Sequence, residues 1–423
     1  MALPHDLQLH RGVPARHRGH QGHRRGQAGG HPGRRALNRA AVTAAYAAQG
    51  LGYAVVVTSL PALKERQSVD DIVVTAIVLG VALFAAAGSV LANAVAVRFG
   101  SRIALVLGLA LQGVALPLIA VPTPFPVFVA AFAVFGAGLG CVDAASAMQG
   151  VAVQRATGRQ LLGGFFAALT AAAIVGALLV SAVAATATAA GVALAAAGAI
   201  ALGIAAFGIR GFVRDVPVDA ALPRAERGVL PRGAIWAFGL VILAAFVVDS
   251  AVSTWSAVYL QDGLSAAAWL APLGYAAYQA VVLVTRLVTD RLLPRFGRAR
   301  LVAVAVTVSA IGCGAVALVP SPAVAVAGFA LAGLATGILV PVAFGAAGDA
   351  APLHADQVIA RVNIFNYAGA IFGAVGVGVL AEGTGLGPAF IVPAVVLLIA
   401  LVALPRFRRA GADSTVQAAS APR

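Results

Sequence analysis

Charged residues are scarce in this chain. Only 10% of its 423 residues are Asp, Glu, Lys or Arg, whereas 61% are hydrophobic. A soluble globular protein typically carries about 25% charged residues. This deficit excludes an ordinary soluble domain and predicts a protein whose surface faces lipid rather than water.

Cysteine and histidine are rare too. Cys141 and Cys313, the only two cysteines, fall inside hydrophobic runs, so neither a disulfide nor a metal framework is indicated. Six of the seven histidines lie in residues 1–35, and His354 is the only one elsewhere. The chain offers no Ser/His/Asp or Cys/His constellation and no P-loop. We therefore expect no enzyme activity, no metal and no cofactor.

What the chain does have is a series of hydrophobic runs, each long enough for a helix to cross a bilayer at about 20 residues. Twelve can be placed, near 40–62, 72–96, 102–121, 126–150, 161–183, 189–209, 234–259, 267–290, 300–319, 323–347, 358–381 and 388–405. Membrane-spanning β-strands would be only about 10 residues long and would alternate in polarity. The predicted fold class is an all-α membrane protein with twelve transmembrane helices.

Basic residues mark every second gap between these runs. The exceptions among the 29 Lys and Arg are Lys64, Arg66 and Arg286. Short loops rich in Lys and Arg stay on the cytoplasmic side, so we expect a multi-pass plasma-membrane protein with both termini in the cytoplasm. The net charge of +14 then belongs to loops that face anionic lipid, and nucleic acid is not an expected partner.

The longest gap divides the runs into six and six. The predicted organisation is a disordered basic tail at 1–38, a six-helix bundle at 39–209, a cytoplasmic linker at 210–233, a second bundle at 234–405 and a tail at 406–423. Whether residues 1–35 belong to the protein is left open. The tripeptide Arg-Phe-Gly recurs at Arg98–Gly100 and Arg295–Gly297, in corresponding loops of the two halves. This recurrence indicates an internal repeat.

These loops resemble the signature of the major facilitator superfamily (MFS), fullest from Arg286 to Arg300 and reduced in the first half, where Val97 replaces the acidic residue. The resemblance implies two pseudo-symmetric bundles that alternate access to a midplane site. It also implies a cytoplasmic latch formed by these loop residues: Arg98, Arg102, Arg286, Asp290, Arg291, Arg295 and Arg300. Arg286 and Asp290 are four apart, which favours a charge pair on one helix face.

Within the superfamily the chain is similar to the sugar-permease-like branch that includes relatives of fucose–proton symporters. The supporting segments are Ser59–Arg66, Asp143 with Gln149–Gly150, and Trp255–Leu260. Several polar residues of those relatives are replaced here, by Ser59, Ala147, Gln154 and Phe166. The branch residues therefore do not transfer as a set.

Two acidic residues lie deep in hydrophobic runs, Asp143 in the fourth and Asp249 in the seventh. Ionisable groups in the membrane are costly and mark functional sites. We expect Asp249 to exchange a proton and Asp143 to assist or to bind substrate; the alternative for each is a structural hydrogen bond. Tyr46, Gln49 and Tyr53 share one face of the first run, and with Trp255 they complete the predicted substrate pathway.

The sequence thus predicts a monomeric secondary active transporter of a small organic solute. A sugar-like substrate and proton coupling are favoured. An efflux carrier for amphipathic compounds and a non-transporting membrane receptor or scaffold are the alternatives. Pro341 is the expected hinge of the tenth helix.

Overall fold

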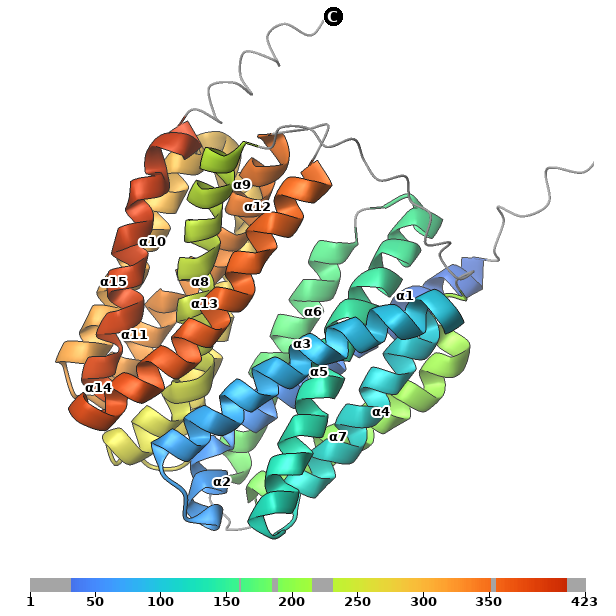
Figure 1. Cartoon of the computed structure of the whole chain (residues 1–423), viewed down its shortest axis with the longest axis horizontal. Helices are drawn as coiled ribbons and strands as arrows, with labels where there is room; N and C mark the ends of the chain where they lie inside the picture. The colour runs from blue at the N-terminus through green and yellow to red at the C-terminus, as the bar shows by residue number, and fades with distance from the viewer. Residues whose placement is uncertain (1–31, 160, 185–188, 215–230, 351–354, 409–423) are drawn as a thin grey trace, which may run out of the picture.

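The computed structural model describes residues 32–159, 161–184, 189–214, 231–350 and 355–408, and these are helical with short connections and no β-strand. The first half contains α1 (Pro32–Thr58), α2 (Leu60–Gln67), α3 (Asp71–Phe99), α4 (Ser101–Ala120), α5 (Phe125–Thr157), α6 (Leu162–Val183) and α7 (Ala189–Gly211). Figure 1 shows these helices packed together as one bundle, coloured blue to green.

The second half forms the other bundle in Figure 1. Its elements are α8 (Arg232–Val258), η1 (Tyr259–Gly263), α9 (Ala271–Phe296), α10 (Arg298–Leu318), α11 (Pro322–Leu334), η2 (Ala335–Leu339), α12 (Val340–Asp349), α13 (Ala355–Thr384), α14 (Leu386–Ala389), α15 (Ile391–Ala400) and η4 (Leu401–Ala403). The helices α11, η2 and α12 follow one another as a single span, and so do α14, α15 and η4.

Twelve helices in the described residues are long and apolar enough to cross a membrane, which confirms the predicted number. Two details differ from the sequence prediction. The first span ends at Thr58, and the separate short helix α2 follows it. Helix α1 begins at Pro32, so residues 32–38 are helical rather than part of a disordered tail. Residues 1–31, most of the predicted linker and residues 409–423 lie outside the described residues.

The repeated Arg-Phe-Gly loops have the same backbone conformation. Gly100 joins α3 to α4 with φ 89° and ψ 155°, and Gly297 joins α9 to α10 with φ 71° and ψ 159°. Positive φ is readily adopted only by glycine. The shared geometry explains why both copies keep this residue although the rest of the first-half motif is reduced.

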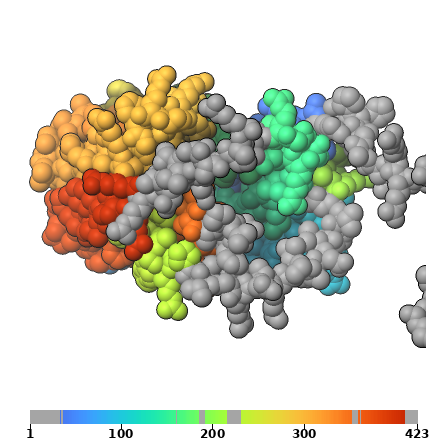
Figure 2. Space-filling model, turned by 90° about the horizontal axis from the view of Figure 1, so that it is seen from above, coloured from blue at the N-terminus to red at the C-terminus, as the bar shows by residue number. Residues whose placement is uncertain are grey.

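Successive spans run in opposite directions, so both Arg-Phe-Gly loops and the last helix end at one side of the molecule, called here the arginine-rich end. Helix α2 lies at the opposite side, the α2 end. In Figure 1 the two bundles meet at the α2 end and diverge towards the arginine-rich end. Seen from the arginine-rich end in Figure 2, they form two masses side by side.

The tenth span changes its helical geometry where Pro341 was expected to act as a hinge. The π-helical turn η2 separates α11 from α12, and Pro341 is the second residue of α12. A π turn widens the helix locally and is frequent at functional sites. Here it brings Thr336 into the interior between the bundles.

Glycines let helices within each bundle pack backbone to backbone. In the first bundle a Cβ added to Gly140 of α5 would lie only 1.8 Å from the carbonyl oxygen of Ala85 in α3. In the second, a Cβ on Gly373 of α13 would lie 2.3 Å from the carbonyl oxygen of Val247 in α8. Small residues at such contacts are the usual means of close packing in membranes.

This packing yields a stability prediction. Gly140→Ala should destabilise the protein by about 1–3 kcal/mol, because overpacking forces the α3 and α5 backbones apart. Gly203→Ala in α7 is the matched control, since a Cβ there meets nothing within 4 Å. Thermal unfolding in detergent should show a lower midpoint for Gly140→Ala than for the unaltered protein. The midpoint of the control variant should be unchanged. Equal midpoints for both variants would contradict the packing argument.

Candidate functional site

A cavity of about 200 Å³ lies between the two bundles. The first bundle contributes Gln49, Gly50, Tyr53, Leu139, Asp143, Leu169, Thr170 and Ala173. The second contributes Phe246, Asp249, Ser253, Tyr275, Gln279, Arg286 and Thr336. Three ionisable side chains and several amides and hydroxyls thus converge in the interior of an otherwise apolar molecule. Such a set of convergent polar groups in a cavity marks a binding site.

On the first-bundle side, three side chains from three helices form a chain of hydrogen bonds. Gln112 of α4 donates to Gln49 of α1 (2.7 Å), and Gln49 donates to the Asp143 carboxylate of α5 (2.7 Å). The same Gln49 nitrogen also donates to the Leu139 carbonyl (3.2 Å). These bonds fix the carboxylate, and Asp143 remains exposed where it lines the cavity.

On the second-bundle side, Asp249 is joined to a hydroxyl relay. The Tyr278 hydroxyl donates to Asp249 at 2.7 Å and lies 2.6 Å from the Thr336 hydroxyl. The Thr336 hydroxyl donates to the Ala245 carbonyl at 3.3 Å. Because the π turn places Thr336 here, the relay connects α8, α9 and the tenth span.

Arg286 also reaches this cavity and links the bundles. Its Nη1 donates to the Thr170 hydroxyl of α6 at 3.1 Å. Arg286 and Asp249 attract each other electrostatically. The guanidinium therefore partly balances the carboxylate charge in the cavity.

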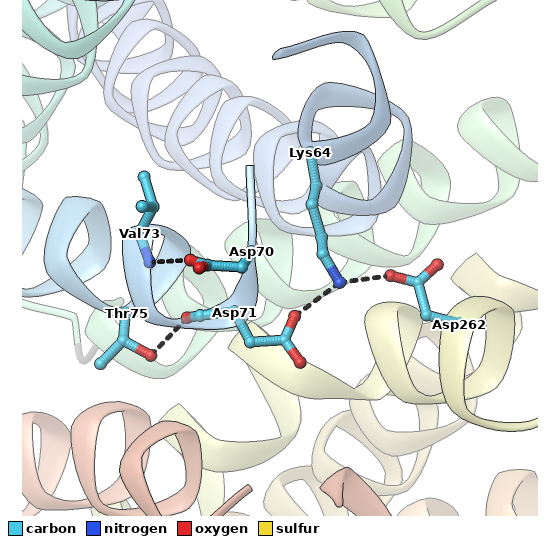
Figure 3. Close-up of polar contacts among 6 residues, drawn as sticks. All are labelled: Lys64, Asp70, Asp71, Val73, Thr75 and Asp262. Atoms are coloured by element: carbon cyan, nitrogen blue, oxygen red, sulfur yellow. Dashed lines mark hydrogen bonds and ion pairs between the residues drawn. The ribbon is translucent and has the colours of Figure 1, made fainter. Parts of the chain in front are cut away.

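The α2 end is closed by contacts between the bundles. Lys64 of α2 lies between two carboxylates, at 2.6 Å from Asp71 of α3 and at 2.7 Å from Asp262 of η1 (Figure 3). Ser181 of α6 donates to the Trp269 carbonyl. Lys64 is thus the cation of an ion pair that crosses from one bundle to the other.

This ion pair is maintained at neutral pH. Burial lowers the pKa of Lys64, but the bonds to Asp262 and Asp71 outweigh burial and leave the pKa above its ordinary value. The ammonium therefore keeps its proton below about pH 10.5, and the stabilisation is lost only as the pH rises through the folded-state pKa. Neighbouring Arg66, in contrast, donates to the Ile119 and Ala120 carbonyls within its own bundle.

Four of the six residues predicted for the substrate pathway line the cavity: Asp249, Asp143, Gln49 and Tyr53. The other two do not. Tyr46 is 4% exposed and stacks on Phe165, one turn nearer the arginine-rich end. Trp255 is fully buried, and its indole N–H donates to the Ala374 carbonyl.

The predicted latch residues separate into two groups. Arg98, Asp290, Arg291, Arg295 and Arg300 are exposed at the arginine-rich end, and Arg102 donates to the Ile209 carbonyl. Arg286 does not belong with them, because it lines the cavity. The expected pair between Arg286 and Asp290 is not among the ion pairs of the described residues. Arg298, which was not predicted as a site residue, pairs with Asp349 instead.

Sequence reasoning missed Tyr275 and Gln279 of α9 and assigned Arg286 of the same helix to the latch. Tyr275, Gln279 and Arg286 line the cavity from this helix, and Gln279 donates to the Tyr275 hydroxyl at 2.6 Å. Their spacing of four and seven places them on one face of a helix. This polar stripe within a hydrophobic run was the signal that could have found them.

A sequence profile described as Major Facilitator Superfamily matches residues 42–329 and 275–422. The chain belongs to the major facilitator superfamily. The predicted family and fold are therefore confirmed, and the protein is a multi-pass membrane transporter of small solutes rather than a member of an enzyme family.

Relatives and solved structures agree with this assignment. An uncharacterized MFS-type transporter of Yersinia pestis is 28% identical over 82% of this chain and 90% of its own length. A bacterial homolog of the human lysosomal transporter Spinster has a similar fold, with TM-score 0.72 and 14% identity over 90% of this chain and 98% of its own. The nucleoside transporter NupG is similar at TM-score 0.69 and 13% identity, covering 88% and 99% of the two chains.

The electrostatic link in the cavity can be tested by a double-mutant cycle. Arg286→Gln and Asp249→Asn should each lower stability, since each leaves one charge in the interior without its partner. The double variant should lose less than the sum, with a coupling of about 0.5–3 kcal/mol. Arg291→Gln is the control, because Arg291 is exposed outside the cavity. Additive losses in thermal unfolding would contradict the link.

Proposed function

We propose that this chain is a proton-coupled secondary transporter of a small polar solute, sugar-like in its hydrogen-bonding groups. The observation that carries the proposal is the cavity between the bundles, where Asp143, Asp249 and Arg286 meet a set of neutral donors and acceptors. Inverted-repeat transporters bind substrate near the midplane between their halves. The location of the cavity agrees with that arrangement.

The relay around Asp249 supports its role as the proton carrier. Each hydroxyl has one proton to donate. When Asp249 is ionised, Tyr278 donates to it and has no proton left for Thr336. When Asp249 is protonated, it can donate to Tyr278, Tyr278 to Thr336, and Thr336 to the Ala245 carbonyl. The protonated carboxyl thus gives a fully satisfied chain, so both protonation states are accommodated in the same position.

The remaining cavity groups favour a hydroxyl-rich solute. The amides of Gln49 and Gln279 each offer donors and acceptors, and the rings of Tyr53 and Tyr275 offer flat faces beside them. Amides and aromatic faces together suit a sugar ring or a similar polyol. The nucleoside transporter among the structural neighbours is compatible with this class, although at such low identity it supports the fold alone.

Alternating access would follow from the contacts between bundles. If the arginine-rich end is cytoplasmic, as the positive-inside rule indicates, the end closed by Lys64 faces outward. The structure then corresponds to an inward-facing state. Breaking the Lys64–Asp262 pair would be part of opening the outer side, and the exposed arginines of the Arg-Phe-Gly loops would form the inner latch.

The substrate class is best sought first by a thermal-shift screen of the purified protein with sugars, organic acids and amphipathic drugs, since a ligand that binds the folded state raises its melting temperature. Sugars should give the largest shifts. Shifts with amphipathic compounds alone would instead support the efflux alternative. Binding without counterflow in liposomes would support a receptor or scaffold.

Proton coupling predicts a specific loss in Asp249→Asn. With the best ligand of the screen, this variant in proteoliposomes should lose uptake driven by a pH gradient, down to the level of protein-free liposomes. It should keep solute counterflow, which needs no net proton movement. Asp290→Asn, the same change at an exposed acid of α9 outside the cavity, should retain both. Full gradient-driven uptake by Asp249→Asn would overturn the proposed coupling.

The ion pair at the α2 end predicts a shift in conformation. Lys64→Asp should increase labelling of a cysteine placed at Ser253 by an impermeant maleimide added from outside, because the bundles separate at that end. Adding Asp262→Lys should restore protection, since the exchanged charges can pair again. Arg66→Gln should have little effect, because Arg66 bonds within one bundle. Unchanged labelling in Lys64→Asp would argue against a gating pair.

A further inference from the structure

A second cavity, distinct from the central one, lies at the arginine-rich end, with a volume of about 400 Å³. The arginine pocket, as it is called here, is lined by Arg298, Arg300 and Arg408 together with Phe296, Leu404 and Phe407. It lies where three spans end, those of α9, α10 and α15. Three cations in one pocket repel one another, and among the described residues only Arg298 of the three has a carboxylate partner, Asp349.

Two arginines of the pocket are held in place by a neighbour, and the backbone of the third is anchored by the residue before it. Arg298 is anchored by its ion pair with Asp349. Arg300 lies over the Phe296 ring, at 5.8 Å from its centroid. Arg408 follows Phe407, which is fully buried and packs edge to face on Phe238 of α8. The pocket is therefore partly preorganised, because two of its cations are positioned without a ligand.

One guanidinium nitrogen in the pocket still needs an acceptor. Asp349 engages Nη2 of Arg298, whereas its Nη1 is buried and has no hydrogen-bond partner among the described residues. An unpaired buried donor is costly. Guanidinium groups match the oxygens of a phosphate group in geometry and charge, so a phosphate would satisfy this donor and offset the repulsion among the three cations.

Apolar surface next to the pocket identifies the source of that phosphate. Val304 of α10 follows the pocket residue Ala303 and is 48% exposed, and Val402 of η4 lies two residues before the pocket residue Leu404 and is 77% exposed. Basic pockets between spans at the membrane surface bind anionic lipid headgroups. We propose that the arginine pocket binds the headgroup phosphate of an anionic phospholipid, whose acyl chains lie along α10 and the final span.

The test uses the purified full-length chain in detergent and three probes: phosphatidylglycerol, phosphatidylcholine of the same acyl chains, and inorganic phosphate. Binding is followed by native mass spectrometry and by the shift in melting temperature. Phosphatidylglycerol should bind and stabilise the protein, whereas phosphatidylcholine and inorganic phosphate at equal concentration should not. Equal effects of the two lipids, or an equal effect of phosphate alone, would overturn the lipid assignment.

Paired variants then locate the site. Arg300→Gln/Arg408→Gln should weaken phosphatidylglycerol binding roughly 30-fold, given the usual contribution of each basic residue at a membrane surface. Arg298 is kept, so its pair with Asp349 remains. Arg291→Gln/Arg295→Gln removes the same charge at the same end outside the pocket and should bind almost as the unaltered protein. If both double variants weakened phosphatidylglycerol binding equally, the effect would be one of general surface charge, and the proposed binding in the arginine pocket would be refuted. If the double variant Arg300→Gln/Arg408→Gln does not fold, the single variant Arg408→Gln can be compared with Arg295→Gln in the same way.

Discussion

Hydrocarbon offers a polar group no hydrogen-bond partner, and the architecture of this chain follows from that constraint. Backbone groups are satisfied within helices. The few polar side chains inside the bundles must then find partners in the protein, and the charged groups of the central cavity do. Asp143 has Gln49, Asp249 has Tyr278, and Arg286 has Thr170. Because each of these groups is costly to bury, their concentration in one cavity makes it the candidate functional site.

The contacts within and between the bundles differ in kind. Within a bundle, Gly140 and Gly373 bring helix backbones together, and such contacts cannot separate without exposing closely packed surfaces. Between bundles, Lys64 with Asp262 and Arg286 with Thr170 use side-chain groups that can exchange partners. One close approach does cross the boundary, at the α2 end, where Gly378 of α13 meets Thr75 of α3. This difference favours two rigid bundles that move against each other.

The sequence could predict whatever depends on local pattern. Hydrophobic length gave the number of spans, and the repeated Arg-Phe-Gly gave two loops of equal geometry. Depth in the membrane singled out Asp143 and Asp249, and both line the central cavity. The direction in which a helix faces was harder to predict. Trp255 is six residues beyond Asp249, which turns it well away from the face that Asp249 and Ser253 share.

The prediction for Arg286 failed for a related reason. Spacing along α9 favoured Asp290 as its partner, but spacing describes only one helix. The other bundle brings Thr170, and α8 brings Asp249, to the opposite side of Arg286. Such a choice between a local and a distant partner depends on packing between helices that are far apart in sequence. A single sequence carries no direct signal of it.

The ionisable groups that line the cavity also constrain the transport cycle. Arg286 with two ionised aspartates gives a net charge of −1, and one proton brings this sum to zero. A carrier must pass through a state in which the site is closed to water on both sides, where an unbalanced charge is most costly. A neutral solute would therefore cross with a proton, whereas a cationic solute could take the place of the proton and exchange with it. Under the proposed proton coupling, the charge of the bound solute would decide between symport and antiport in the same cavity.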